Sequence, residues 1–323
     1  MLSYKPLHFC SGFLFMFYYW LYQPTLTFMN IKILMIALTL SYNVMLSGEL
    51  LQGITVQPEQ TLHGVKGFEV ICSYSFQSIR TAYGKGKQTD TILDKSSFEL
   101  ICIVYENQIG VKPAAGYGHL ANSKDEIAFK YTFTNSEVTS TEKSGTQQIF
   151  IPYCALGMQQ GNHTIAIKAI IRGKDGTGKT YEEQEVQRGI TFTKPKTRTF
   201  HLTIGHIEVT PLDGSGKSWD NSMFGKEAPD VGVTVLVANT AIWHNEVNDT
   251  YMFAVGPYSQ NIAFLISEDD TVTLLVEDMD VVLRNDHIAT WYIPTGDNQS
   301  NTVQQFEGKS PLVKSHNITY RIE

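Results

Sequence analysis

Cysteine is scarce in this chain of 323 residues, which contains only Cys10, Cys72, Cys102 and Cys154. Cys72 and Cys102 fall in segments that we predict to be strands, and Cys154 directly follows one. These three cysteines form one disulfide at most and leave one thiol over. Cys72 and Cys102 are the candidate pair, and buried free thiols are an equal alternative. The spacing of the cysteines matches no zinc site.

Basic residues are scarce in the second half of the chain. Residues 201–300 hold three Lys or Arg against 15 Asp or Glu, whereas residues 1–200 hold 19 against 15. An acidic surface repels the phosphates of DNA and RNA, so this balance excludes nucleic acid as a partner. It fits a domain whose surface charge is partly neutralised by divalent cations.

Helical periodicity is also scarce, and short segments rich in β-branched and aromatic residues take its place. Glycine-rich turns separate these segments, which predicts an all-β fold of two β-sandwich domains, at residues 52–198 and 199–323. The linker between the two domains is expected at residues 191–198, where Pro195 interrupts strand pairing. The predicted strands are residues 68–76, 98–105, 126–134, 147–153, 164–171, 189–193, 201–210, 233–237, 251–255, 262–266, 271–276, 288–292 and 318–322.

The first 48 residues hold two apolar runs: residues 7–21, which are short for a membrane span of about twenty residues, and residues 31–46, which follow Met29. Read from Met29, the segment has a short polar head, an apolar body and the small residues Ser47 and Gly48, which is typical of a signal peptide. We therefore predict a cleaved leader that starts at Met29, and a mature protein that is secreted, periplasmic or at the cell surface. The alternatives are an anchoring helical hairpin, or an upstream extension of residues 1–28 that the true start excludes.

Carboxylates gather between two predicted strands, residues 271–276 and 288–292. Asp278, Asp280 and Asp286 follow an Asp-x-Asp-x5-Asp pattern in the loop between them. Crowded carboxylates repel one another and need a compensating cation. Calcium fits best, because it takes about six to eight oxygen ligands in a flexible shell.

This loop resembles the third calcium-binding loop of C2 domains, and the resemblance covers roughly residues 199–323. In that family a first loop supplies two more aspartates, here Asp230 after Pro229 and Asp220 before it, with Asp213 or Glu227 as substitutes for Asp220. Residues 242–246 are similar to the Trp-Asn-Glu segment of the family with one residue inserted. The resemblance implies Ca²⁺ as the cofactor, the Met279 carbonyl as an extra ligand, and the metal ligands Asp220, Asp230, Asp278, Asp280 and Asp286. A metal-free acidic hairpin loop is the alternative.

Apolar residues lie between the proposed ligands, where loop tips are normally polar. In C2 domains such tips enter the lipid interface, which implies an anionic phospholipid membrane as the partner and a non-enzymatic function. Folding back against their own domain is the alternative for these side chains. The expected membrane contacts are Met223, Phe224, Val281, Val282, Leu283 and Arg284.

Two other functions fit parts of the sequence. A calcium-stabilised extracellular structural or adhesion protein would bind a protein or glycan through residues 52–198. Nucleotide binding is suggested by Gly173–Thr180, which matches the G-x4-G-K-[ST] pattern of phosphate-binding loops. The segment after Thr180 is too short for the helix that such a loop needs, so a hairpin tip explains the pattern better. No nucleophile–base pair is evident, which argues against an enzyme.

Overall fold

The computed structural model describes residues 50–84, 87–140, 144–217, 219–222, 225–254, 260–279, 286–296 and 303–323. Glu49–Glu323 make up one compact unit. The leader predicted at residues 1–48 lies outside the described residues, as do Met223, Phe224, Asp280 and residues 281–284. Within the part of the chain that is described, no helix is both long and apolar enough to cross a bilayer.

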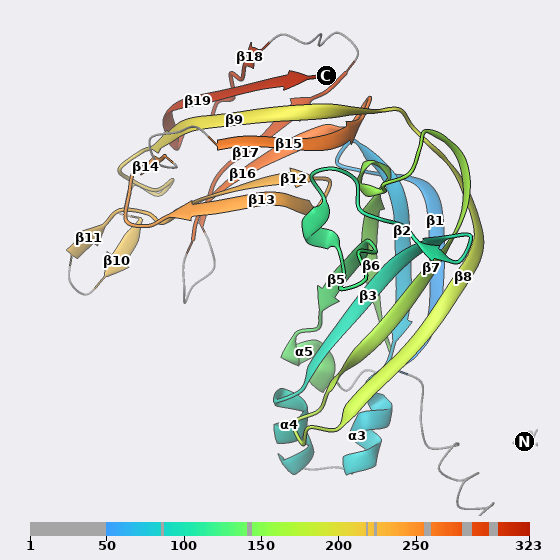
Figure 1. The fold of residues 1–323 in the computed structure, drawn as a ribbon. Coiled ribbons are helices and arrows are strands. Elements are labelled where there is room, and N and C mark those ends of the chain that lie inside the picture. The colour runs from blue at the N-terminus through green and yellow to red at the C-terminus, as the bar shows by residue number, and fades with distance from the viewer. Residues whose placement is uncertain are drawn as a thin grey trace, which may run out of the picture. The chain divides into compact units, whose positions relative to one another are not determined.

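The first half of this unit contains two antiparallel sheets that pack face to face (Figure 1). One is a three-stranded sheet in the order β1-β2-β6, from β1 (Leu51–Leu62), β2 (Val65–Tyr74) and β6 (Gly145–Pro152). The other has the order β4-β3-β7-β8 with β5 on β3, from β3 (Ser97–Glu106), β4 (Ile109–Gly110), β5 (Ala128–Thr132), β7 (Gly161–Lys174) and β8 (Thr180–Lys194).

Alternating apolar residues build the core between these sheets, because successive side chains of a strand point to opposite faces. The inner face of β3 carries Phe98, Leu100, Cys102 and Val104, and each of these residues is at most 1% exposed. Aromatic rings bridge the sheets: the ring centroids of Phe68 on β2 and Phe192 on β8 are 4.7 Å apart. Burial of such faces supplies most of the driving force for folding.

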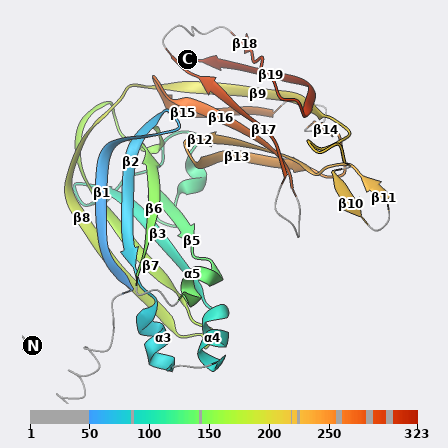
Figure 2. The same cartoon turned by 180° about the vertical axis from the view of Figure 1, so that it is seen from behind.

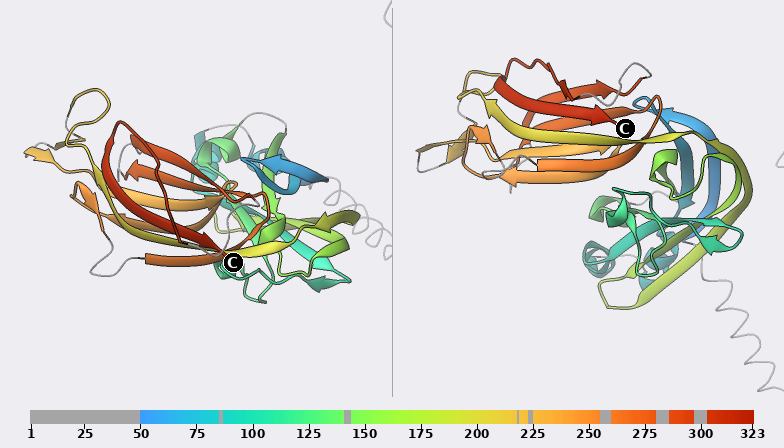
Figure 3. Two further views of the ribbon diagram at one scale, coloured as in Figure 1. Left: turned by 90° about the horizontal axis from the view of Figure 1, so that it is seen from above. Right: turned by 45° about the horizontal axis from the view of Figure 1, so that its top comes forward.

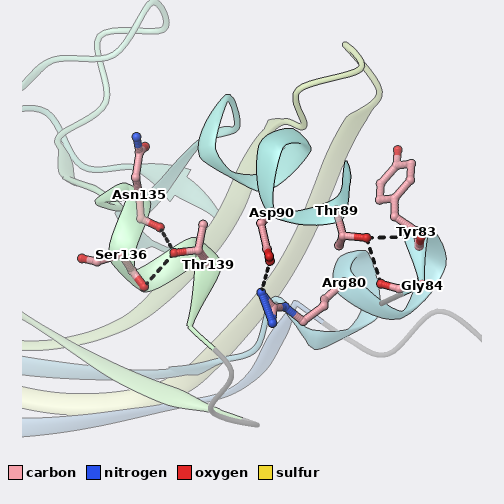
Figure 4. A network of polar contacts seen from close by, with 8 residues as sticks. All are labelled: Arg80, Tyr83, Gly84, Thr89, Asp90, Asn135, Ser136 and Thr139. Atoms are coloured by element: carbon pink, nitrogen blue, oxygen red, sulfur yellow. Dashed lines mark hydrogen bonds and ion pairs between the residues drawn. The ribbon is translucent and has the colours of Figure 1, made fainter. Parts of the chain in front are cut away.

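Short helices occupy two places where the sequence indicated only turns. Residues 77–94 form α3 (Gln77–Tyr83) and α4 (Lys87–Asp94), and α5 (Asn135–Thr139) follows β5. The Arg80 guanidinium donates to Asp90 at 2.7 Å, and the Thr89 hydroxyl donates to the carbonyl of Gly84 at 2.9 Å, so polar contacts join α3 to α4 (Figure 4). The helix α5 begins at a capping box, in which Thr134 and Glu137 satisfy each other's backbone N–H groups.

The second half contains two more antiparallel sheets and a small hairpin (Figure 2). One sheet has the order β13-β12-β16-β17, from β12 (Val231–Val237), β13 (Thr240–Val247), β16 (Thr271–Asp278) and β17 (Asp286–Pro294). The other has the order β14-β9-β19-β18 with β15 also on β9, from β9 (Thr197–Val209), β14 (Met252–Phe253), β15 (Gln260–Ser267), β18 (Gln304–Gln305) and β19 (Val313–Ile322). The hairpin pairs β10 (Asp220–Ser222) with β11 (Gly225–Glu227).

The all-β fold class predicted from the sequence is confirmed, with antiparallel sheets packed as sandwiches. The connection between the halves is shorter than the linker that the sequence suggested, because β8 continues to Lys194 and β9 begins at Thr197 (Figure 3). Only Pro195 and Lys196 lie between these strands. Polar contacts also join the halves: the Tyr117 hydroxyl donates to the carbonyl of Leu265 on β15 at 2.8 Å.

Candidate acidic site at one end of the C-terminal sheet

Three of the five proposed ligands meet where the sheet of β12, β16 and β17 ends. Asp278 is the last residue of β16, where it pairs with Val231 on one side and with Asp286 on the other. Asp230 immediately precedes β12, and its backbone N–H donates to the Asp278 carboxylate at 2.8 Å. The Met279 N–H in turn donates to the carbonyl of Asp230 at 2.8 Å. The described residues where the two sequence-named loops meet the sheet, Asp230 and Asp278, therefore lie side by side at one end of it.

The carboxylates differ in how much water reaches them. Asp278 is 1% exposed, Asp230 is partly buried and Asp286 is exposed. Oδ1 of Asp278 accepts from a loop N–H, and Oδ1 of Asp230 accepts from the N–H of Asp249 at 2.7 Å. These two carboxylates consequently hold the loop backbones in place, which fixes the positions of the carboxylates themselves.

Asp249 also lies at this acidic end of the sheet and was not among the predicted ligands. Its segment joins the site because the Thr250 N–H donates to the carbonyl of Pro229 at 3.0 Å. Asp249 has a positive φ of 51°, a conformation that Asp and Asn adopt more readily than other non-glycine residues. The Asn248-Asp249 pair was the available signal, since such pairs are typical of turns.

The remaining proposed ligands are only partly placed. Asp280 and the side chain of Asp220 fall outside what the structure describes, although the backbone of Asp220 pairs with Glu227 in the β10–β11 hairpin. Among the described residues, no group of three or more His, Cys, Asp or Glu side chains is arranged to hold a metal ion. A calcium shell at this end would therefore depend on Asp280, on Asp220 and on main-chain or lipid oxygens as well.

Asp213, the substitute considered for Asp220, belongs to a turn of its own. Its carboxylate accepts from the N–H groups of Lys217 at 2.7 Å and Ser215 at 2.9 Å. The hydrogen bond from the Lys217 backbone is the largest of the effects that lower the pKa of Asp213. This carboxylate therefore stabilises its own turn.

Exposed apolar side chains lie at the same end of the molecule. Leu212 is 44% exposed, Tyr251 36% and Met252 47%. The Val209 N–H donates to the carbonyl of Tyr251, and Met252 pairs with Glu208 at the end of β9 (Figures 1 and 2). The exposure of Tyr251 and Met252 was not predicted: among the described residues of the strand expected at 251–255, only Met252 and Phe253 pair with β9.

Two histidines near the acidic end contact threonines. Nδ1 of His244 lies 2.9 Å from the Thr234 hydroxyl, and Nε2 of His287 lies 2.8 Å from the Thr290 hydroxyl. These contacts are between neighbours on the sheet surface. They give both histidines a packing role.

The segment Gly173–Thr180 forms the tip of the β7–β8 hairpin. The Asp175 N–H donates to the carbonyl of Lys179 at 3.0 Å, which closes the turn. The strand β8 starts at Thr180, whereas a phosphate-binding loop continues into a helix whose N-terminal amides hold the phosphate. The Lys179 ammonium lies 4.9 Å above the centroid of the Tyr181 ring. The geometry is that of a turn rather than of a phosphate cradle.

Comparison with known proteins identifies no family for the chain. No protein-family model matches it, and no curated protein does either. Among solved structures, it is similar to the major pilin subunit of Bacillus cereus, with 9% identity and a TM-score of 0.22 over 76% of this chain and 66% of the pilin chain. The chain thus spans slightly less than two thirds of that pilin. An overlap this low supports no conclusion about fold or function.

Proposed function

We propose that this protein binds Ca²⁺ at the acidic end of its C-terminal sheet and uses the bound ion to dock on anionic phospholipid, without catalysing a reaction. The observation that supports this most directly is the hydrogen bond from the Asp230 N–H to the Asp278 carboxylate. That bond joins Asp230 to Asp278, and Asp286 pairs with Asp278 across the ladder, which supports a shared site for these three carboxylates. The proposal places the protein outside the cytoplasm, where calcium is plentiful enough for sites of modest affinity.

The charge of this region explains why an ion would be needed. Residues 201–300 have 12 more acidic than basic residues, so the uncomplexed end repels an anionic lipid surface. Bound calcium makes the local potential positive and lets lipid phosphates add oxygen ligands that the protein lacks. Each ligand then strengthens the binding of the other, so the calcium affinity rises when membrane is present.

The apolar side chains beside the acidic end supply the second part of docking. Leu212, Tyr251 and Met252 are exposed to water in the protein alone. Moving such a side chain fully into an apolar phase is worth roughly 1.5–3 kcal/mol, and partial insertion is worth less. Residues 223–224 and 281–284 would join this surface under the proposal.

The decisive experiment is sedimentation with vesicles of phosphatidylserine and phosphatidylcholine, in calcium or in a chelator, beside a calorimetric calcium titration. The wild-type protein is expected to sediment only with calcium. Asp278→Asn with Asp280→Asn should abolish calcium binding and sedimentation, while the calcium-free fold stays as stable or becomes more stable as repulsion is relieved. The Asn at position 278 still accepts the N–H of Asp230, so the loop contact survives.

A matched control removes the same number of negative charges at positions outside the proposed site. Asp94→Asn with Asp269→Asn removes two exposed carboxylates, one at the end of α4 and one just before β16, at the opposite end of that strand from Asp278, and should leave both readouts at wild-type values. Met252→Ser with Leu212→Ser should weaken sedimentation several-fold at an unchanged calcium affinity. A calcium titration that the site variant does not alter would refute the ligand set. Stabilisation by calcium without sedimentation would favour an adhesion or structural role.

A further inference from the structure

Two cysteines face each other across the N-terminal sandwich. In β2 the inward row of side chains is Phe68, Val70, Cys72 and Tyr74, and in β3 it is Phe98, Leu100, Cys102 and Val104. Phe76, just after β2, has its ring centroid 4.9 Å from that of Phe98 at the start of β3. The end of one row therefore lies over the start of the other, and each row carries a cysteine in its interior.

Cys72 and Cys102 lie in these two facing rows, inside the same hydrophobic core. Both residues are fully buried, and both are free thiols in the structure. The hydrogen bond between the two thiols is the main cause of the raised pKa of Cys102, followed by burial. In sandwich domains, an inter-sheet disulfide joins cysteines that occupy such inward positions on strands of the two facing sheets.

The third cysteine of the sandwich has different neighbours. Cys154 lies in the short 3-10 helix Tyr153–Ala155, and its Sγ is 3.2 Å from the Tyr117 hydroxyl. Burial is the largest cause of the raised pKa of Cys154, and the negative charge of Asp270 adds to it. This thiol is therefore held in a polar contact and is kept protonated.

We propose that Cys72 and Cys102 form a disulfide between β2 and β3 when the chain folds in an oxidising compartment, and that Cys154 remains a thiol. The proposal shares the extracytoplasmic location with the proposed function but depends on neither calcium nor lipid. The bridge would enclose the 29 residues between the two cysteines, which include α3 and α4.

The reaction needs a disulfide-bearing oxidant, either a small molecule such as oxidised glutathione or an oxidoreductase. One cysteine thiolate attacks the oxidant's S–S bond, forming a mixed disulfide and releasing one thiolate of the oxidant. The second cysteine thiolate attacks the mixed disulfide and releases the other. The protein loses two protons and two electrons, and the oxidant becomes two thiols. Because both sulfurs are inaccessible in the closed sandwich, this exchange takes place before the sheets close.

The test uses the full chain, folded with a glutathione redox pair and then alkylated in denaturant without reductant. Mass spectrometry should find one peptide pair that joins Cys72 to Cys102, with Cys154 alkylated. Protein that is unfolded, reduced and refolded in the presence of reductant should melt at a temperature lower by on the order of 10 °C, because the bridge restricts the unfolded chain. Alkylation of both Cys72 and Cys102, or a link that includes Cys10 or Cys154, would overturn the assignment.

Two variants separate the bridge from a general effect of reductant. Cys154→Ala should keep the difference in melting temperature between oxidised and reduced protein. Cys72→Ala should remove that difference, because only one member of the pair remains. If Cys72→Ala unfolds too easily to melt cooperatively, Cys72→Ser with Cys102→Ser serves instead, and a difference that persists there contradicts the proposal.

Discussion

Asp175 explains why the segment Gly173–Thr180, which matches a phosphate-binding pattern, forms a hairpin turn. It is 3% exposed at the tip of the β7–β8 hairpin, and its carboxylate accepts from the Tyr83 hydroxyl at 2.5 Å and the Tyr181 hydroxyl at 2.9 Å. The N–H groups of Thr177 and Lys179 donate to it as well. Burial alone would raise the pKa of Asp175, but the hydrogen bonds outweigh burial and hold it at about 2. The glycines near Asp175 in the sequence belong to this hairpin tip.

Replacing Asp175 by alanine is expected to lower the free energy of unfolding at pH 7 by roughly 2 kcal/mol, because several donors lose a charged acceptor. The folded-state pKa is below that of an unfolded Asp, about 3.9, so this stabilisation is complete above pH 4. It is lost as the pH falls towards 2. Urea unfolding of both proteins between pH 2 and 7 measures the effect.

The control for this measurement is Asp94→Ala, which removes an exposed carboxylate at the end of α4. It should change stability by no more than a few tenths of a kcal/mol. A difference between Asp175→Ala and wild type that stays constant down to pH 2 would show that the carboxylate charge contributes nothing.

At the scale of elements, the segment of residues 113–120 docks directly on β15. The Leu265 N–H donates to the carbonyl of Ala115 at 3.1 Å, and Gly116 has a φ of +87°. A Cβ placed on Gly116 would lie 2.3 Å from Cβ and 2.5 Å from Cα of Phe264. The backbone of this segment therefore approaches the strand as closely as a glycine allows.

Gly116→Ala is consequently expected to lower the free energy of unfolding by roughly 2–4 kcal/mol, from strain at positive φ and from overpacking. Gly118→Ala is the matched control two residues away, since a Cβ there meets no atom within 4 Å. Thermal unfolding followed by circular dichroism compares the two. Equal melting temperatures for the two variants would show that the close approach to Phe264 is absent in solution.

The sequence predicted most strands but not all elements, and the misses have physical causes. The strand β1 was overlooked because Gly53 and Pro58 interrupt its alternation; β1 is an edge strand, where proline is tolerated. The helices α3 and α4 are only seven and eight residues long, too short for a periodic pattern to stand out. Their stability comes from contacts with each other and with the sandwich, which local sequence does not encode.

The candidate site was predictable only where residues lie at the end of a predicted strand or next to it. Asp230 and Asp278 flank the paired strands β12 and β16, so their proximity follows from sheet register. Asp249 and Met252 reach the same end through loop contacts between segments that are distant from β16 in the chain. Such contacts depend on how the loops close, and no periodic pattern marks them.

At the scale of the whole molecule, ionisable groups with raised pKa values are buried in the core. Burial is the main cause of the raised pKa of Tyr117, Tyr153 and Cys154. Lys194 opposes them, because burial lowers its pKa while its ammonium donates to the carbonyl of Leu156 at 2.8 Å. In the folded protein, three acids therefore keep their protons at a pH where the unfolded chain releases them.

We expect stability to fall at alkaline pH. Each raised pKa contributes stability that is complete below the unfolded value, about 8.5 for Cys and 10 for Tyr, and that is lost as the pH rises towards the folded value, by at most about 1.4 kcal/mol per pH unit. The lowered pKa of Lys194 has the opposite effect, because it makes stability rise with pH up to about pH 10.4, but Lys194 is one group against three.

Melting temperatures between pH 8 and 11 should therefore decrease steadily, and Tyr117→Phe should make that decrease shallower. Tyr292→Phe, at a tyrosine that is 56% exposed, should leave the slope unchanged. A melting temperature that is level from pH 9 to 11, or an identical slope for Tyr117→Phe, would mean that these groups ionise as freely in the folded protein as in the unfolded chain.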